Sequence, residues 1–435
     1  MKLFKIRFFA LILFVTGWSS LLGQTPKITR GPYLQVVTPS SIIVRWRTDM
    51  PTSSKVLYGQ KQDKLNLTAT SANLTTEHEI TLSSLKPATS YHYAIGTDNI
   101  PLAVGSDMFF HTAPKTGAKT KVRIWAIGDF GNSSDNQING RDQILKATTD
   151  HRPDVWLMLG DNAYSKGFDD EFQRHLFAQY QNSFLPNTPS YATPGNHDYG
   201  GKPDQFDIPY FKSFTMPEKA EAGGVPSGSE SYYSFDYGNI HFVSLDSYGK
   251  LDGQHWLYDT TGRQVDWLKR DLAANKQPWT IVFFHHPPYT KGSHDSDKET
   301  ALVKIRQNLL PILERYNVDL VLGGHSHVYE RTFPLVGHYG LAQTFDKNKH
   351  VVSAATSDQH NEYRLGRKKQ GIIYIVAGSG GQLGGKANGY PHPAMVYSNN
   401  TEGGSMLIDV AGKRLNARWV CSDGVVRDEF TIVKK

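Results

Sequence analysis

Two kinds of hydrophobic pattern divide the chain. Residues from about 25 to 113 alternate apolar and polar positions over short runs, which Pro, Gly and Ser residues separate. The clearest runs are Ser41–Trp46, Lys55–Tyr58, Glu79–Leu82 and Leu85–Ile95. Alternation over a few residues is typical of half-buried strands, so this region predicts a small β-sandwich.

From residue 121 to about 390 short, mainly apolar runs alternate with segments that have helical spacing. The apolar runs are 122–127, 155–159, 279–284 and 318–322, and helical spacing covers 263–274 and 301–316. Buried strands that alternate with helices predict a layered α/β domain. Residues 404–435 return to alternating strands, which we expect to pack onto this domain. The predicted boundaries are 24–118 for the β-sandwich and 119–435 for the α/β domain.

The first 23 residues follow a different order. Lys2, Lys5 and Arg7 precede an apolar run from Phe8 to Val15, and small and polar residues lead to Gly23. This is the order of a secretory signal peptide, and the apolar run is well short of the about 20 residues that a membrane-spanning helix needs. We therefore expect cleavage and a secreted or periplasmic protein, with an uncleaved anchor as the alternative. No later segment is long and apolar enough to span a bilayer.

Charge and cysteine content narrow the classes of partner. Removal of the three leader cations lowers the formal net charge from +6 to +3, a mildly basic balance that suits small anionic substrates. No Lys/Arg run is long enough to follow a nucleic-acid backbone, so a nucleic-acid partner is not expected. Cys421 is the single cysteine, which excludes an intrachain disulfide and leaves the core or metal ions to stabilise an exported chain.

Chemically active residues stand at the ends of the apolar runs. They occur as Gly128-Asp129-Phe130-Gly131, Gly160-Asp161-Asn162-Ala163-Tyr164, Gly195-Asn196-His197-Asp198, His285-His286 and Gly324-His325-Ser326-His327. In open α/β sheets, sites form beyond the carboxyl edge of the strands, where glycines allow tight turns. Each motif alone has a structural explanation, such as a turn, a helix cap or a pair of core histidines. Five motifs in the same position relative to a strand indicate one shared site.

The residue types in these motifs suit two adjacent metal ions. Two Asp, one Asn, one Tyr and three His offer both oxygen and imidazole donors. One carboxylate can bridge two ions about 3.5–4 Å apart. His325 and His327 lie two residues apart on one loop, so each can face a different ion. The sequence therefore predicts a dinuclear metal centre.

In chain order these motifs resemble the five motifs of the purple acid phosphatases, a group of the calcineurin-like metallophosphoesterases. The matching patterns are GDxG at 128–131, GDxxY at 160–164, GNHD at 195–198, VxxH at 282–285 and GHxH at 324–327, with VYER following at 328–331. The resemblance covers residues 121 to about 390 and implies a layered αββα metallophosphoesterase domain. The strand around Trp46 and the LxPxTxYxY pattern at 85–93 resemble a fibronectin type III module, which matches the plant-like long members of the family.

The resemblance also implies a role for each ligand. Asp129, Tyr164 and His327 would hold one metal, Asn196, His285 and His325 would hold the second, and Asp161 would bridge them. A phenol, with a pKa of about 10, binds as phenolate at low pH only on a strongly Lewis-acidic ion, which favours Fe³⁺ at Tyr164. The second metal would be Fe²⁺, Zn²⁺ or Mn²⁺, and the sequence does not choose among them.

The implied activity is hydrolysis of small phosphate monoesters by a secreted acid phosphatase, with attack by a metal-bound hydroxide. His197 follows a ligand directly and is the candidate general acid, a role that the family analogy supports. The structural alternative is that His197 only orients its loop through Asp198. His294 is the second histidine expected to face the substrate. Asp295 stands where related chains often carry another histidine, and its charge would repel a phosphate unless it is protonated or paired with Lys291.

Two other functions are compatible with the sequence. A phosphodiesterase of the same superfamily would share the metal motifs without needing Tyr164, and turnover of a monoester against a bis-ester separates the two. A non-enzymatic surface protein that binds a glycan or a partner through the β-sandwich would lack metal affinity. The sequence leaves the physiological substrate, the oligomeric state and the role of the β-sandwich undetermined, and His286 could tune the ligands or only pack behind them.

Overall fold

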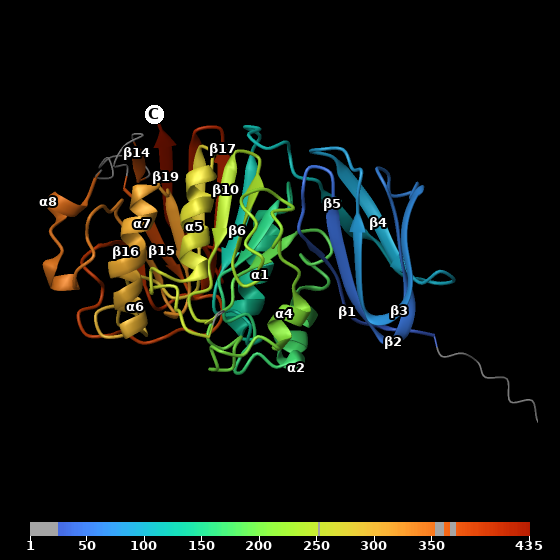
Figure 1. Cartoon of the computed structure of the whole chain (residues 1–435), viewed down its shortest axis with the longest axis horizontal. Coiled ribbons are helices and arrows are strands. Elements are labelled where there is room, and N and C mark those ends of the chain that lie inside the picture. The colour runs from blue at the N-terminus through green and yellow to red at the C-terminus, as the bar shows by residue number, and fades with distance from the viewer. Residues whose placement is uncertain (1–24, 251–252, 353–360, 366–370) are drawn as a thin grey trace, which may run out of the picture.

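The chain forms a small N-terminal sheet and a larger domain built on two further sheets (Figure 1). The computed structural model describes residues 25–250, 253–352, 361–365 and 371–435. The predicted signal peptide at 1–23 lies outside these residues. Within the described ranges, no helix has the length and apolar character that a bilayer crossing requires.

The N-terminal sheet has the strand order β1-β2-β4-β5, and β3 also pairs with β2. Its strands are β1 (Ile28–Gln35), β2 (Ile42–Gly59), β3 (Leu67–Leu82), β4 (Ser90–Gly96) and β5 (Pro101–His111). The first half of β2 pairs with β1 and the second half with β4, while β3 runs beside both halves. One long strand therefore belongs to both halves of the β-sandwich.

Two details of this sheet differ from the sequence prediction. We expected two separate strands within β2, but it is one strand, and Pro51 lies in a stretch of register shifts against β3. A bulge tolerates the missing N–H of proline, so the strand bends there instead of ending. The strand expected at 85–95 begins only at Ser90, because Ala88 has a φ of 48° and lies in a turn.

The first sheet of the larger domain has the order β14-β19-β18-β17-β6-β7-β8. Its strands are β6 (Val122–Ile127), β7 (Val155–Met158), β8 (Ser190–Ala192), β14 (Glu362–Leu365), β17 (Gly404–Ala411), β18 (Arg414–Cys421) and β19 (Val426–Lys434). β6, β7 and β8 are parallel, whereas β17 pairs with β6 in antiparallel fashion. We had expected the C-terminal strands to pack onto the domain, but they continue this sheet beyond β6.

The second sheet has the order β16-β13-β15-β12-β11-β10-β9. Its strands are β9 (Tyr233–Tyr237), β10 (Ile240–Ser244), β11 (Trp279–Phe283), β12 (Leu320–Gly323), β13 (Tyr329–Thr332), β15 (Ile373–Ala377) and β16 (Met395–Asn399). β10, β11, β12 and β15 are parallel to one another, β9 and β13 pair with the outer two in antiparallel fashion, and every residue of the four parallel strands is buried. Parallel strands in the middle of a sheet need cover on both sides, which explains why their residues are mainly apolar.

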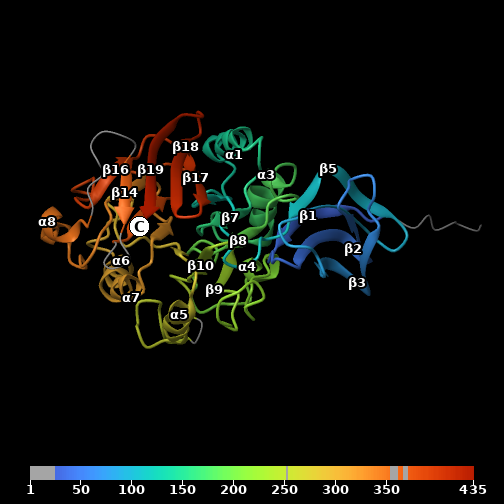
Figure 2. The same cartoon turned by 90° about the horizontal axis from the view of Figure 1, so that it is seen from above.

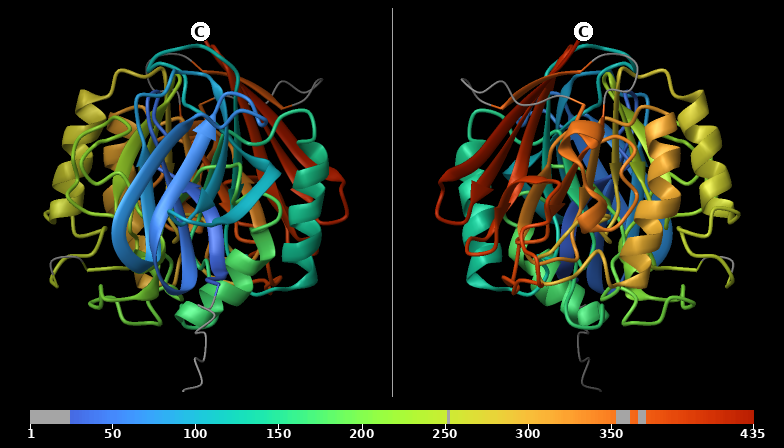
Figure 3. Two further views of the ribbon diagram at one scale, coloured as in Figure 1. Left: turned by 90° about the vertical axis from the view of Figure 1, so that its right-hand side faces the viewer. Right: turned by 90° about the vertical axis from the view of Figure 1, so that its left-hand side faces the viewer.

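Helices cover the outer faces of the two sheets, which gives the αββα layering (Figures 2 and 3). They are α1 (Asp135–Ala147), α2 (Asp169–Glu171), α3 (Ala178–Tyr180), α4 (Pro209–Ser213), α5 (Arg263–Ala274), α6 (Thr300–Lys304), α7 (Leu310–Arg315) and α8 (Lys347–His350), with π-helical turns η1 (Phe172–Phe177) and η2 (Ile305–Leu309) and a 3-10 turn η3 (Ala342–Thr344). α1 contacts β17 and β18 on one flank, and α5, α6 and α7 lie on the opposite flank.

The N-terminal sheet is bonded directly to the larger domain. The Tyr33 hydroxyl donates to the carbonyl of Ser213 over 2.9 Å, and the Tyr93 hydroxyl donates to the carbonyl of Pro186 over 2.8 Å. Both bonds are buried, and one hydrophobic cluster runs through the two parts without a break. The two parts therefore share an interior.

Candidate metal centre

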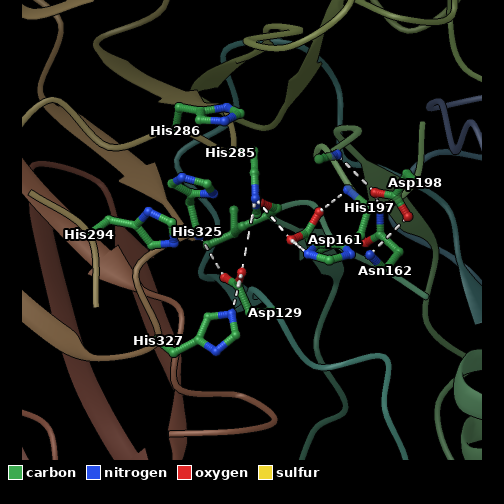
Figure 4. A network of polar contacts seen from close by, with 12 residues as sticks. Asp129, Asp161, Asn162, His197, Asp198, His285, His286, His294, His325 and His327 are labelled. Carbon is green, nitrogen blue, oxygen red and sulfur yellow. Dashed lines mark hydrogen bonds and ion pairs between the residues drawn. The ribbon is translucent and has the colours of Figure 1, made fainter. Parts of the chain in front are cut away.

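Most of the predicted site residues lie on five loops that meet in one cluster, where Figure 4 labels Asp129, Asp161, His197, His285, His294, His325 and His327. Asp129 follows β6, Asp161 and Tyr164 follow β7, Asn196 and His197 follow β8, His285 follows β11, and His325 and His327 follow β12. Parallel strands present their carboxyl ends at the same edge of a sheet, so neighbouring loops deliver their side chains to the same place. Parallel strands within each sheet, and the packing of the two sheets, thus assemble the cluster.

Two carboxylates and one imidazole form the centre of the cluster. Donor atoms of Asp129, Asp161 and His285 lie within 4.8 Å of one another, and all three side chains are buried. His285 Nε2 is 3.2 Å from Asp161 Oδ2 and 3.9 Å from Asp129 Oδ1. Burial opposes protonation of His285, but Asp161 and Asp129 outweigh it and raise the pKa to about 9. Two buried carboxylates therefore favour a positive charge at this position.

Tyr164 joins this centre from the loop that carries Asp161. Its hydroxyl lies 3.1 Å from Asp129 Oδ1, 3.2 Å from Asp161 Oδ2 and 3.2 Å from His327 Nε2. Burial and the two nearby carboxylates raise the pKa of Tyr164 well above its ordinary value. The phenol therefore ionises only if a cation offsets the carboxylates.

Asn196 and His197 approach from the loop after β8. Asn196 Oδ1 is buried and has no hydrogen-bond partner among the described residues. The His197 backbone N–H donates to Asp161 Oδ1 over 2.8 Å, and its ring Nδ1 donates to the carbonyl of Ser165 over 2.6 Å. His197 Nε2 lies 3.9 Å from Asp161 Oδ2, and the side chain is 37% exposed. His197 therefore faces both the cluster and the solvent.

The loops reach this arrangement through unusual backbone geometry. Asp129, Asp161 and His325 have φ values of 57°, 52° and 64°, in the left-handed region that side chains with a Cβ rarely adopt. A Cβ at Gly195 would lie 2.2 Å from Asp161 Oδ1, so only glycine permits this approach. Strained backbone that converges on one spot is a feature of functional sites.

A second group of imidazoles borders the centre. The His294 ring lies 3.7 Å from the His325 ring, and His294 Nδ1 is 3.0 Å from both oxygens of Glu299. His325 Nε2 is 3.6 Å from the same carboxylate. His286 lies 4.2 Å from the His325 ring on the other side and bonds Ser247 through Nδ1 over 2.9 Å. Burial, with the neighbouring histidines, lowers the pKa of His286 well below its ordinary value, which favours the neutral ring.

Comparison with known families agrees with this geometry. Residues 30–113 match the purple acid phosphatase N-terminal domain, and residues 122–329 match the calcineurin-like phosphoesterase family. The chain belongs to the purple acid phosphatases. Membership classes the chain with the phosphoric monoester hydrolases and confirms the family and fold that the five motifs predicted.

Individual relatives show how far the similarity extends. Purple acid phosphatase 23 of Arabidopsis thaliana is 30% identical over 281 residues, which are 58% of this chain and only 57% of that protein. Acid phosphatase type 7 of Danio rerio is 26% identical over 91% of this chain and 89% of its own length. The solved structure of purple acid phosphatase PPD1 from yellow lupin aligns with a TM-score of 0.71 at 19% identity, over 94% of this chain and 74% of that chain.

The residues present fit the dinuclear centre of the purple acid phosphatases. Asp129, Asp161 and His285 form one group that could hold a metal ion, and His285 Nε2 has no well-aligned hydrogen-bond partner among the described residues. The orphaned Oδ1 of Asn196 offers a further oxygen donor. Buried polar atoms without partners are costly, and a cation would satisfy them. The individual ligand assignments stay predictions.

The sequence did not predict that two acidic residues, Asp198 and Glu299, support the residues of the site. Asp198 accepts the backbone N–H and the side-chain amide of Asn162 over 3.0 and 2.9 Å, and the N–H of Gly195 over 2.8 Å, so it ties the loops after β7 and β8 together. Burial and the charge of Asp161 raise the pKa of Asp198 to about 8. Glu299 was not singled out at all, because only the folded loop brings it beside His294.

Asp295 was expected to face the substrate, and the structure describes its partners. Asp295 Oδ1 lies 2.5 Å from Lys291 Nζ, the pairing that would remove its repulsion of a phosphate. Lys298 Nζ lies 3.7 Å from Oδ2, and only 7% of Asp295 is exposed. Its role in substrate binding stays a prediction.

Proposed function

We propose that this chain is an exported acid phosphatase that hydrolyses phosphate monoesters at a dinuclear metal centre. The observation that carries the proposal is the convergence of Asp129, Asp161 and His285, with the hydroxyl of Tyr164 within 3.2 Å of both carboxylates. Relatives named purple acid phosphatase and acid phosphatase support the same reaction class.

The proposed ligands divide into two sets that share one carboxylate. Asp129, Tyr164 and His327 would hold Fe³⁺, whereas Asn196, His285 and His325 would hold Fe²⁺, Zn²⁺ or Mn²⁺, and Asp161 would contact both. The ions would supply Lewis-acid charge neutralisation and a nucleophilic water that is acidic enough at low pH. Coordination of Tyr164 as phenolate at acidic pH would need a trivalent ion, because a weakly acidic cation would not displace the proton of a phenol.

His197 is the residue that we assign to proton donation. The carbonyl of Ser165 holds Nδ1, which leaves Nε2 on the side of the cluster, 3.9 Å from Asp161 Oδ2. A protonated Nε2 can give its proton to the oxygen that leaves when the phosphate ester bond breaks. The half-open position of His197 lets it exchange this proton with solvent between turnovers.

His294 is placed to bind the phosphate group itself. Glu299 engages Nδ1 of His294 with both carboxylate oxygens, which fixes the ring and leaves Nε2 free for a phosphate oxygen. The ring also lies 3.7 Å from the ring of His325, so it lies beside the proposed second metal. His294 therefore orients the substrate, and His197 acts on its leaving group.

Steady-state hydrolysis by the purified protein tests this proposal. We expect turnover of a phosphate monoester at acidic pH, at least tenfold faster than that of a matched bis-ester, and loss of activity on chelation. A faster bis-ester reaction would replace the proposal with a phosphodiesterase. A protein that binds no metal and hydrolyses neither ester would favour the non-enzymatic surface protein. Mass spectrometry of the mature protein from its native host would show whether the chain begins near Gly23, as cleavage of the expected signal peptide requires.

A further inference from the structure

Two arginines of the N-terminal sheet form ion pairs with one aspartate of the larger domain. Arg47, in β2, binds Asp169 with both terminal nitrogens, over 2.6 Å to Oδ2 and 2.9 Å to Oδ1. Arg30, in β1, reaches the same Oδ1 over 3.0 Å and the Asp169 carbonyl over 3.2 Å. Arg30 is fully buried and Arg47 is 19% exposed. We call Arg30, Arg47 and Asp169 the arginine clamp; paired arginine–carboxylate bonds fix both distance and orientation.

The clamp holds the first residue of α2, which follows a short loop at 164–168 that we call the site loop. Glu171, at the other end of α2, accepts three backbone N–H groups of the site loop: Ser165 over 2.7 Å, Lys166 over 3.0 Å and Phe168 over 2.9 Å. Burial opposes ionisation of Glu171, but these three N–H groups prevail and lower its pKa. The position of α2 therefore determines the position of the site loop.

The site loop in turn contacts the two residues closest to the proposed chemistry. It begins with Tyr164, and the carbonyl of Ser165 holds the His197 ring at 2.6 Å. The rings of Tyr164 and His197 lie 4.6 Å apart. Gly167 has a φ of 62°, and a Cβ there would lie 2.6 Å from the carbonyl of Asp198. The site loop thus packs closely against the backbone of His197 and Asp198.

We infer that the N-terminal sheet is a positioning element of the active site. Through Asp169 and Glu171, the arginine clamp fixes the site loop and hence the ring of His197. The inference rests on the proposed function for its catalytic consequence, but not for the loop geometry. The N-terminal sheet would therefore affect turnover without contacting the substrate itself.

Arg45 provides a matched control within the same strand. It also crosses to the larger domain, where it donates to the Lys212 carbonyl over 2.8 Å and to Thr215 Oγ1 over 3.1 Å. Those residues lie at the end of α4 and just beyond it, not on the site loop or α2. Arg45→Gln therefore weakens the interface without touching the clamp. Arg47→Gln also removes the ion pair between Arg47 and Glu77. Glu77 is exposed, so the loss of this ion pair should change the free energy of unfolding only slightly.

The experiment compares Arg47→Gln, Asp169→Asn and Arg45→Gln in the full-length, metal-loaded protein. Amide hydrogen exchange of residues 165–168 and tryptic cleavage after the exposed Lys166 report the loop directly. We expect exchange and cleavage to rise about tenfold in the first two variants and to stay at the wild-type rate in Arg45→Gln. We expect kcat to fall about tenfold, with KM within about twofold, because His197 acts on the leaving group. Arg47→Lys, which keeps the charge, should restore part of both readouts.

Two results would overturn the inference. Wild-type exchange at the site loop in both clamp variants would show that the loop is held without the N-terminal sheet. Equal loosening in Arg45→Gln would show that the interface only adds general stability. Exchange and cleavage need no substrate, so they decide the inference even if the wild-type protein fails to hydrolyse monoesters, a failure that would count against the proposed function alone.

Discussion

Replacement of His197 by Ala tests the proposed proton donor directly. The backbone N–H that His197 donates to Asp161 Oδ1 remains in the variant, so the proposed bridging carboxylate keeps its support. Only the ring is lost, with its bond to the carbonyl of Ser165 and its contact with Tyr164. We therefore expect the variant to fold and to keep its metal content while its turnover falls.

The magnitude follows from what the ring does and where it lies. Positioned proton transfer contributes about 10²- to 10⁴-fold to a rate, which corresponds to about 3–5 kcal/mol of activation free energy. The side chain is 37% exposed, so its removal should lower the free energy of unfolding by no more than about 1 kcal/mol. Activity and stability therefore separate clearly in this variant.

The assay compares substrates whose leaving groups need the proton to different degrees. An alkyl phosphate expels a strongly basic alkoxide, whereas p-nitrophenyl phosphate expels a stable phenolate that needs little protonation. We expect His197→Ala to lose about 10²-fold or more in kcat with the alkyl ester and much less with the aryl ester. His151→Ala is the matched control, because His151 is similarly exposed, at 39%, and pairs with Asp154 away from the cluster.

Two outcomes would refute this reasoning. Loss of metal in His197→Ala, measured by elemental analysis, would make the ring a structural support of the centre. An equal loss with both substrates would mean that the ring does not protonate the leaving group.

Two further predictions concern groups behind the site. Asp198→Asn replaces one of two oxygens that accept only N–H groups, so metal affinity should fall about 10- to 100-fold in competition with a chelator, and unchanged affinity would contradict this. His241 lies buried between Asp236 and Asp271; burial opposes its charge, but their hydrogen bonds raise its pKa to about 9 from 6.5. Protonated His241 should add about 3 kcal/mol to the free energy of unfolding below pH 6.5, and this stabilisation is lost as the pH rises through 9. Urea unfolding at a series of pH values should show the decline in the wild type and not in His241→Gln.

The features that the sequence revealed are those that depend on neighbouring residues. Mainly apolar runs located β6, β7, β11 and β12, because a strand buried on both faces leaves few polar positions. The site residues follow these strands directly, so locating the strands also located Asp129, Asp161 and His285. Parallel pairing of β6 with β7 then accounts for the nearness of Asp129 and Asp161. His285 follows a strand of the other sheet, so its approach depends also on how the two sheets pack.

Contacts between distant parts of the chain were beyond such reasoning. The register that joins β17 to β6 couples segments about 280 residues apart, and no local pattern marks it. Glu299 reaches His294 only because the intervening loop folds back, and its own surroundings in the sequence resemble a solvated helix start. The bonds of Arg47 to Asp169 likewise depend on how two domains dock. Hydrophobic pattern carries no information on which charged side chains will meet.

The visible absorption spectrum of the purified protein is the most direct test of the central claim, recorded beside Tyr164→Phe and with elemental analysis of both. A phenolate on Fe³⁺ absorbs by charge transfer, so we predict a broad band that colours the wild type purple or pink. The band should be absent from Tyr164→Phe. A colourless wild-type protein with two metal ions per chain would contradict the assignment of Tyr164 to ferric iron and would leave a Zn²⁺ or Mn²⁺ pair, with the phosphodiesterase reading, in its place.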